Sequence, residues 1–216
     1  DCLLSRGLGD VYKRQALLRG AYASSADVAA GRWPRTALSQ GLEAHGRTLG
    51  VVGFGGIGQL TARLAAGLGM RIVACDAALP ATHPVWAESG ATPLPLEALL
   101  AQADAVSLHV PLNADTRHLL NADRIRGMRP GAILVNTSRG GIVDEAALAA
   151  ALRMGHLRGA ALDVFDQEPL PAGGPLADAP NLILTPHIAG LTQEANTRVS
   201  DMVAAGVTIA LTGGAR

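Results

Sequence analysis

The chain contains few of the residues on which several classes of protein depend. Its 216 residues include two cysteines, Cys2 and Cys75, too few for a disulfide framework, so we expect a reducing compartment and a cytoplasmic protein. The formal net charge is +0, which gives no electrostatic reason to expect nucleic acid or a membrane surface as a partner. No apolar run is long enough to span a bilayer, and no Cys/His spacing suggests a metal site.

Aromatic residues are scarce as well. They make up 3% of a chain in which 49% of the residues are hydrophobic, so alanine, leucine, valine and glycine must build the core. A chain of this length can bury one good core, or one domain with an appendage. The composition therefore predicts a soluble globular domain.

The most informative stretch is a short apolar run followed by a glycine-rich turn. Residues 49–53 have the continuous apolar pattern of a strand that is buried on both faces. Gly53, Gly55 and Gly58 follow at the G-x-G-x-x-G spacing, and residues 57–68 have an apolar helical stripe. Such glycines allow a tight turn, close approach to a pyrophosphate, and close contact between helix and strand. The free N–H groups at the start of the helix then face the phosphates.

A chain with 26 glycines can produce this motif by chance, so the motif alone is weak evidence. A second feature of the sequence supports the same interpretation. Residues 71–76 form a predicted strand that ends in Asp76, 18 residues after Gly58 (76 − 58). A carboxylate about 20 residues after the last glycine binds the ribose hydroxyls in dinucleotide-binding units. It accepts a hydrogen bond from the 2′-OH and repels a 2′-phosphate, which favours NAD over NADP. The alternative is an ordinary aspartate at the end of a strand.

The alternation of predicted elements indicates the fold class. Strands are predicted at residues 49–53, 71–76, 104–109, 131–136, 159–163 and 181–184, and helices at 16–30, 57–68, 95–102, 145–154 (capped by Asp144) and 192–211. Six short apolar strands that alternate with helices predict an α/β fold with a doubly wound parallel sheet. Ligands bind such sheets outside the carboxyl ends of the strands, where the polar clusters of this chain lie.

Three of these clusters carry reactive side chains: Arg139 in Asn-Thr-Ser-Arg-Gly-Gly, Glu168 in Asp-Val-Phe-Asp-Gln-Glu-Pro, and His187 in Thr-Pro-His-Ile-Ala-Gly. With these motifs in this order, the chain resembles the D-isomer-specific 2-hydroxyacid dehydrogenase family over about residues 16–211. The resemblance implies a Rossmann domain that binds NAD, with most of the companion substrate domain missing. It also implies an NAD-dependent oxidoreductase that acts on the CH–OH group of a D-2-hydroxy acid.

By this resemblance Arg139, Glu168 and His187 form the catalytic set, and the chemistry of the three side chains agrees. The Arg139 guanidinium can hold a 2-oxo acid by its carboxylate and carbonyl oxygens. His187 can donate a proton to the carbonyl as hydride arrives, or remove it in the reverse direction. Glu168 can orient the imidazole and favour its protonated form. Taken singly, Arg139 could be a solvated or salt-bridged residue, and His187 could be a structural histidine.

The resemblance also implies which residues line the cofactor and what the chain associates with. Asp163 should face the nicotinamide ring, and the other residues expected to line the cofactor are Gly53, Gly55, Gly56, Ile57, Gly58, Asp76, Val110, Thr116, Thr137, Ser138 and Gly190. A homodimer is expected, with the arm around Trp33 reaching the partner. The substrate should be a small 2-hydroxy or 2-oxo acid; 3-phosphoglycerate, glyoxylate, hydroxypyruvate and sulfolactate all remain open.

The chain departs from the family pattern at its N-terminal end. Residues 1–15 include the single lysine, Lys13, and resemble an adapter-derived leader found at the ends of translated metagenomic fragments, so we expect a non-native leader in place of the native N-terminus. Residues 16–46 should form a connecting helix and arm, 47–190 the dinucleotide-binding domain, and 191–216 a C-terminal helix that returns to the absent substrate domain. A chain of this kind should bind NAD and turn over poorly.

Three alternatives remain open from the sequence. The first is a non-catalytic NAD-binding dimerisation module on the same fold. The second is a relative with different chemistry, such as a formate dehydrogenase, in which an amide replaces the acid; Glu168 argues against it. The third is an inactive and marginally folded fragment whose apolar helix faces lack their cover.

Overall fold

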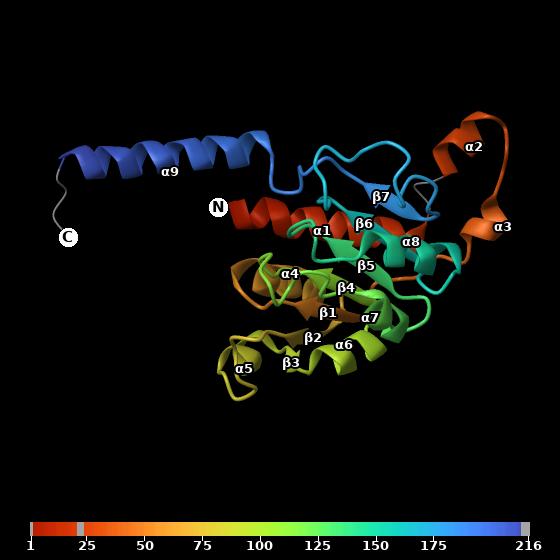
Figure 1. Cartoon of the computed structure of the whole chain (residues 1–216), viewed down its shortest axis with the longest axis horizontal. Coiled ribbons are helices and arrows are strands. Elements are labelled where there is room, and N and C mark those ends of the chain that lie inside the picture. The colour runs from red at the N-terminus through yellow and green to blue at the C-terminus, as the bar shows by residue number, and fades with distance from the viewer. Residues whose placement is uncertain (1, 21–23, 213–216) are drawn as a thin grey trace.

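A parallel sheet forms the centre of the protein in the computed structural model, which describes residues 2–20 and 24–212 (Figure 1). Its strands are β1 (Thr48–Val52), β2 (Arg71–Cys75), β3 (Thr92–Pro93), β4 (Ala105–Leu108), β5 (Ile133–Asn136), β6 (Gly159–Leu162) and β7 (Leu182–Leu184). All neighbours are parallel in the order β3-β2-β1-β4-β5-β6-β7. The strand order reverses between β1 and β4, which is the switch point at which doubly wound sheets bind ligands.

Helices cover both faces of the sheet, as a doubly wound fold requires. The helices of the described residues are α1 (Cys2–Arg19), α2 (Ser25–Ala29), α3 (Arg35–Leu38), α4 (Gly56–Gly67), α5 (Val85–Ser89), α6 (Leu96–Gln102), α7 (Ala122–Gly127), α8 (Glu145–Arg153) and α9 (Gln193–Thr212). The predicted α/β class is confirmed. The six predicted strands are present, whereas β3, α3 and α7 were not predicted.

Alternate side chains of each strand enter two separate apolar clusters. Leu49 and Val51 of β1 pack with α1 and α4 on one face, whereas Val52 packs with α6 and α8 on the other. A Cβ at Gly50 would lie 2.4 Å from Leu99 Cδ2, so the absence of a side chain there lets α6 approach β1. Burial on both faces explains why the strands are continuous apolar runs.

Helix α1 belongs to the packed body, although residues 1–15 resemble a leader. It lies against α4 and against β5 and β6, and it buries Asp10, Lys13 and Arg14, which are 0%, 0% and 1% exposed. Arg14 donates a hydrogen bond to Asp10, and the Lys13 Nζ lies 3.7 Å from Asp163 Oδ1, so these charges are buried in pairs. The foreign origin of the segment stays a prediction.

The predicted helix over residues 16–30 is wrong at Gly20. Helix α1 ends at Arg19, and Gly20 has a φ of 64°, a left-handed conformation that ends helices and that glycine adopts without a steric cost. A separate helix, α2, begins at Ser25. Residues 21–23 of this predicted helix, and 213–216 of the predicted C-terminal segment, lie outside the described residues.

Two further predicted helices differ in their surroundings. Asp144 caps α8 as expected, because its side chain accepts a hydrogen bond from the Ala147 N–H at 2.9 Å.

Helix α9 extends away from the body of the protein (Figure 1). Its exposed apolar side chains are Val199, Met202, Val203, Val207, Ile209 and Leu211. Of the helices within the described ranges, none combines the length and apolar character needed to cross a bilayer.

Candidate active site

The predicted site residues lie in loops and in the first turn of α4, at the edge of the sheet where β1, β2, β4, β5, β6 and β7 end. In a parallel sheet these carboxyl ends all point the same way, so segments far apart in the chain meet there. We call this edge the carboxyl rim. It has a half formed by the loops after β1 and β2, and a half formed by the loops after β5, β6 and β7.

The loop after β1 has the shape that a phosphate cradle requires. Gly53 has a φ of 90°, and a Cβ there would lie 2.6 Å from the His109 carbonyl oxygen. A Cβ at Gly58 would lie 2.1 Å from the Gly53 carbonyl oxygen, so Gly58 allows α4 to start directly against the loop. A Cβ at Gly55 would meet no heavy atom of the described chain within 4 Å. The loop is therefore tight on its inner side and open on its outer side, which fits a pyrophosphate.

Asp76 lies at the end of β2 beside this loop. Its carboxylate accepts hydrogen bonds from the Phe54 N–H at 2.7 Å and from the Ala78 N–H at 2.8 Å. A cavity of about 470 Å³ adjoins it, lined by Gly53, Asp76, Val110 and Thr116 together with apolar side chains such as Leu94. An apolar cavity with a carboxylate at its edge fits a nucleoside whose ribose hydroxyls donate to the acid.

A smaller hollow of about 190 Å³ continues along the rim toward β5. Most of its lining was predicted to contact a cofactor or substrate: Ile57, Val110, Thr137, Ser138 and Arg139. The turn after β5 is organised by Asn136, whose side chain accepts from the Ser138 N–H and donates to the Arg139 carbonyl, both at 3.0 Å. Asn136 was not singled out from the sequence. Its position as a polar residue at the end of a buried strand could have indicated this role.

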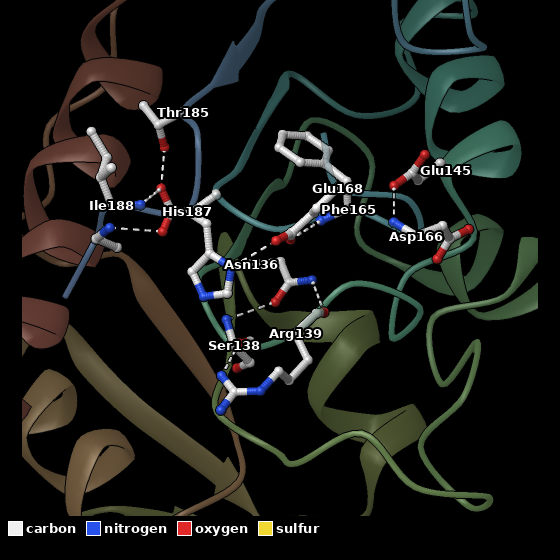
Figure 2. Close-up of polar contacts among 12 residues, drawn as sticks. Asn136, Ser138, Arg139, Glu145, Phe165, Asp166, Glu168, Thr185, His187 and Ile188 are labelled. Atoms are coloured by element: carbon white, nitrogen blue, oxygen red, sulfur yellow. Dashed lines mark hydrogen bonds and ion pairs between the residues drawn. The ribbon is translucent and has the colours of Figure 1, made fainter. Parts of the chain in front are cut away.

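His187 and Glu168 meet at the other half of the rim (Figure 2). The Nδ1 atom of His187 lies 2.8 Å from Glu168 Oε2, and the Phe165 N–H donates to Glu168 Oε1 at 3.0 Å. These hydrogen bonds, first the one from His187 and then the one from Phe165, hold the pKa of Glu168 below its usual range. Both side chains border a cavity of about 640 Å³ whose other walls are mainly apolar.

Arg139 belongs to the same half of the rim. Its Nη1 donates to the Ser138 carbonyl at 2.6 Å, and its charge adds to the lowering of the Glu168 pKa. A Cβ at Gly140 would lie 1.7 Å from the Phe165 carbonyl oxygen, so the absence of a side chain brings the Arg139 loop against the Glu168 loop. Figure 2 shows Arg139, His187 and Glu168 grouped on this side of the sheet.

Asp163 directly follows β6 and is 1% exposed. Its Oδ1 accepts hydrogen bonds from the Thr185 hydroxyl and, at 3.1 Å, from the Ile188 N–H; its Oδ2 accepts from the Ala189 N–H at 2.7 Å. Asp163 thus binds the loop that carries His187 and Gly190. Its predicted contact with a nicotinamide ring stays a prediction.

One buried histidine lies next to the predicted cofactor residues. His109 shares a hydrogen bond of 2.8 Å between its Nε2 and the Ser107 hydroxyl. Burial lowers the pKa of His109 to about 4, even though Asp10 opposes the shift. His109 is therefore neutral near pH 7, which suits a buried structural residue better than one that exchanges protons.

The fold and the rim together define a Rossmann-type dinucleotide-binding domain. The profile of the family described as D-isomer specific 2-hydroxyacid dehydrogenase, NAD binding domain, matches residues 14–189. The chain belongs to this family, and it contains the family's NAD-binding domain.

Individual relatives agree with this assignment. The chain is 54% identical over 184 residues to an (S)-sulfolactate dehydrogenase of Chromohalobacter salexigens, an alignment that covers 85% of this chain and 59% of the relative. It is 44% identical over 180 residues to a glyoxylate reductase of Korarchaeum cryptofilum, covering 82% of this chain and 54% of the relative. The chain thus spans somewhat more than half the length of these relatives.

A solved structure shows the same arrangement of elements. A D-lactate dehydrogenase from Aquifex aeolicus, complexed with NAD and lactic acid, superposes with a TM-score of 0.86 at 29% identity. The match covers 97% of this chain and 66% of that chain. The fold therefore extends over nearly the whole of this chain and about two thirds of the solved structure.

Proposed function

We propose that the protein is an NAD-dependent oxidoreductase that interconverts a D-2-hydroxy acid and the corresponding 2-oxo acid. The observation that carries the proposal is the 2.8 Å contact between His187 and Glu168, which groups with Arg139 at the rim beside a glycine loop. A purely structural histidine has no need of a carboxylate partner at a ligand-binding edge. An imidazole oriented by a carboxylate is the arrangement that general acid–base catalysis uses.

Each of the three side chains has a distinct role in the proposed reaction. The Arg139 guanidinium binds the carboxylate and the 2-oxygen of the substrate. His187 donates a proton to that oxygen during reduction and removes it during oxidation. Glu168 fixes the imidazole orientation through Nδ1 and stabilises its protonated form. Bound NAD supplies the hydride chemistry.

The cofactor-binding half of the rim favours NAD over NADP in this proposal. Asp76 places a negative charge beside the cavity that fits a nucleoside, and a carboxylate repels a 2′-phosphate. The proposed contacts are Gly53, Gly55, Gly56, Ile57, Gly58, Asp76, Val110, Thr116, Thr137, Ser138, Asp163 and Gly190.

The substrate class follows from the side chain that would recognise it. A sulfolactate dehydrogenase and a glyoxylate reductase act on acids that share an oxygenated carbon next to a carboxylate. Arg139 can bind this common part, so we propose a small 2-oxygenated acid without choosing among the four candidates. We further propose a homodimer, in which the arm with Trp33, 76% exposed, contacts the partner.

The test is NADH oxidation by the purified chain with glyoxylate, hydroxypyruvate and sulfopyruvate as separate substrates. Turnover that falls at least about 100-fold in His187→Ala, with NAD affinity retained, supports the enzyme proposal. Background oxidation that is equal in wild type and His187→Ala contradicts catalysis by this chain.

A second candidate, an NAD-binding module without turnover, is favoured by one observation. The chain covers 59% of its sulfolactate dehydrogenase relative, so the rest of that relative has no counterpart in the alignment. Thermal melting with and without NAD separates this candidate from a chain with no functional site. Binding to the folded state raises the midpoint by mass action, and an unchanged midpoint at saturating NAD contradicts both candidates.

A further inference from the structure

The loop that carries Glu168 follows β6 and makes few backbone contacts with the rest of the protein. Two N–H groups of residues 164–168 donate hydrogen bonds within the described part of the chain. The Phe165 N–H donates to Glu168 Oε1, inside the loop, and the Asp166 N–H donates to Glu145 Oε1 at 2.8 Å. Among the described residues, the Glu145 carboxylate is thus the only group outside the loop that hydrogen-bonds its backbone.

Glu145 extends from an element that is itself firmly held. It lies in the first turn of α8, directly after Asp144, whose side chain caps the helix by accepting the Ala147 N–H. The helix buries four apolar side chains in the core: Leu148, Ala149, Ala151 and Leu152. Figure 2 shows the Glu145 carboxylate directed at the backbone of Asp166. An ionised acceptor strengthens such a bond, so the start of α8 holds the loop at this residue.

Phe165 connects this hydrogen bond to Glu168. The N–H of Phe165 binds Glu168 Oε1 at 3.0 Å, and the next N–H along the chain, that of Asp166, binds Glu145. The Phe165 carbonyl oxygen lies so close to Gly140 that a Cβ there would be 1.7 Å away. Loss of the Glu145 bond would let the peptide between Phe165 and Asp166 rotate, and the donor that orients Glu168 would move with it.

The histidine on the other side of the contact has its backbone set by a different loop. His187 has a φ of 55°, in the left-handed region, and its N–H donates to the Thr185 carbonyl at 3.0 Å. The side chains of His187 and Glu168 are 48% and 38% exposed, so packing around them holds them weakly. Their 2.8 Å contact therefore depends on how each loop backbone is fixed.

We propose that Glu145 is a positioning residue: by accepting the Asp166 N–H, it fixes the loop backbone that presents Glu168 to His187. The role requires an acceptor oxygen at the end of the side chain, which glutamine also has. A carboxylate in the first turn of a helix also interacts favourably with the helix dipole, but that effect requires the charge. The effect of Glu145 on turnover rests on the proposed function, whereas its effect on the contact between Glu168 and His187 does not.

The direct test is NMR of the purified 216-residue chain, with amide exchange at Asp166 and the carboxyl titration of Glu168 as readouts. In Glu145→Ala the Asp166 N–H loses its acceptor and should exchange at least about tenfold faster. The titration midpoint of Glu168, which the contact with His187 holds below 4.5, should rise toward that value. Glu145→Gln keeps an acceptor and should match wild type in both readouts.

Glu97→Ala is the matched control for the loss of a glutamate from the first turn of a helix. Glu97 lies in the first turn of α6 and pairs with Arg124, so its removal should leave the Asp166 exchange rate and the Glu168 midpoint unchanged. If Glu145→Ala fails to fold, Glu145→Met supplies a side chain of similar length without an acceptor oxygen, in a residue type that favours helices. The outcomes expected for the alanine variant then apply to the methionine variant.

Two outcomes overturn the proposal. One is a Glu168 midpoint that stays at the wild-type value in Glu145→Ala, whatever the exchange rate of Asp166. The other is an equal change in Glu145→Ala and Glu145→Gln, which would assign the effect to the charge at the start of α8.

Turnover, where the chain shows it, gives a second and separable readout. Glu145→Ala should lower kcat at least about fivefold with the KM for NADH within about twofold, because a misplaced Glu168 affects the chemical step. Glu145→Gln should restore kcat. Failure of the proposed function removes turnover in wild type as well, whereas failure of the positioning role leaves the Glu168 midpoint unchanged by the substitution.

Discussion

The two halves of the carboxyl rim contribute to the site in different ways. The half after β1 offers backbone: Gly53 and Gly58 have no side chains, and Cβ atoms there would clash at 2.6 and 2.1 Å. The half after β5, β6 and β7 offers side chains, with Arg139, Glu168 and His187 grouped across three loops. The half after β1 depends on the absence of side chains, which lets the backbone come close. The half after β5, β6 and β7 depends on the presence of charged side chains and of a group that can transfer a proton.

The difference follows from what each half has to recognise. A phosphate binds to N–H groups, which every backbone supplies, so close approach is the only requirement. A proton transfer needs a group that titrates near the working pH and points at the reacting atom. Substitutions should accordingly affect folding and cofactor affinity in the first half, and rate in the second.

The largest effect is expected for Gly58→Val. The new side chain would enter the space held by the Gly53 carbonyl, which is backbone and cannot rotate away, so α4 must move. We expect NAD affinity to fall at least about 100-fold and the melting temperature to drop, measured by calorimetry and thermal melting. Gly55→Ala is the control, because a Cβ there meets no heavy atom of the described chain within 4 Å; it should keep the wild-type melting temperature.

Glu168→Gln tests the other half with the smallest change in shape. An amide can still hydrogen-bond the imidazole, but it no longer stabilises the protonated form. We expect kcat to fall about 10- to 100-fold with the Kd for NAD unchanged, measured by steady-state kinetics and titration. A large loss of NAD affinity in this variant would remove the distinction between the halves.

A smaller effect is expected for Asp76→Asn, which tests the nucleoside end. Loss of the charge removes the repulsion of a 2′-phosphate, and the isosteric amide weakens the hydrogen bonds from Phe54 and Ala78. The preference for NADH over NADPH should fall about tenfold, while the response of turnover to His187→Ala stays the same. Equal cofactor preference in wild type and variant would show that Asp76 does not discriminate.

The smallest expected effect is on pH dependence. Because the folded-state pKa of Glu168 lies below its ordinary value of 4.5, the carboxylate contributes stability above that value, and the contribution is lost as the pH falls through the folded pKa. The His187–Glu168 contact should therefore persist at pH 4.5 and disappear below it, followed by the Glu168 carboxyl resonance. His187→Ala should shift the carboxyl midpoint upward, and a midpoint unchanged by that substitution would show that the imidazole does not lower the pKa of Glu168.

Local sequence patterns were sufficient for most of the sheet. The apolar run before Gly53 and the cap at Asp144 depend on neighbours in the chain, and both are confirmed. β3 was missed because two residues, one of them a proline, carry no periodic pattern. The buried ion pair of Asp10 and Arg14 could not be predicted either, because charged residues are normally exposed and only their partners explain their burial.

Some contacts of the site could also be predicted from the sequence, and others could not. Glu168 and His187 belong to recognisable motifs, so we expected them to lie together, and they do. The bonds from Asp163 to the loop after β7 had no such signal, because two of the three donors are backbone N–H groups, which any residue type supplies. Long-range contacts to backbone leave little trace in the residue types involved.

The left-handed backbone conformation at position 187 lowers the stability of the loop when the residue is a histidine, which is the residue that the proposed proton transfer requires. Glycine adopts a φ of 55° without the steric cost that histidine incurs there, about 1–3 kcal/mol for a non-glycine residue. His187→Gly should therefore melt at a higher temperature than His187→Ala, although neither retains an imidazole. If the histidine is the proton-transfer group, the most stable loop and the most active loop require different residues, so selection for thermal tolerance alone would tend to erase the activity.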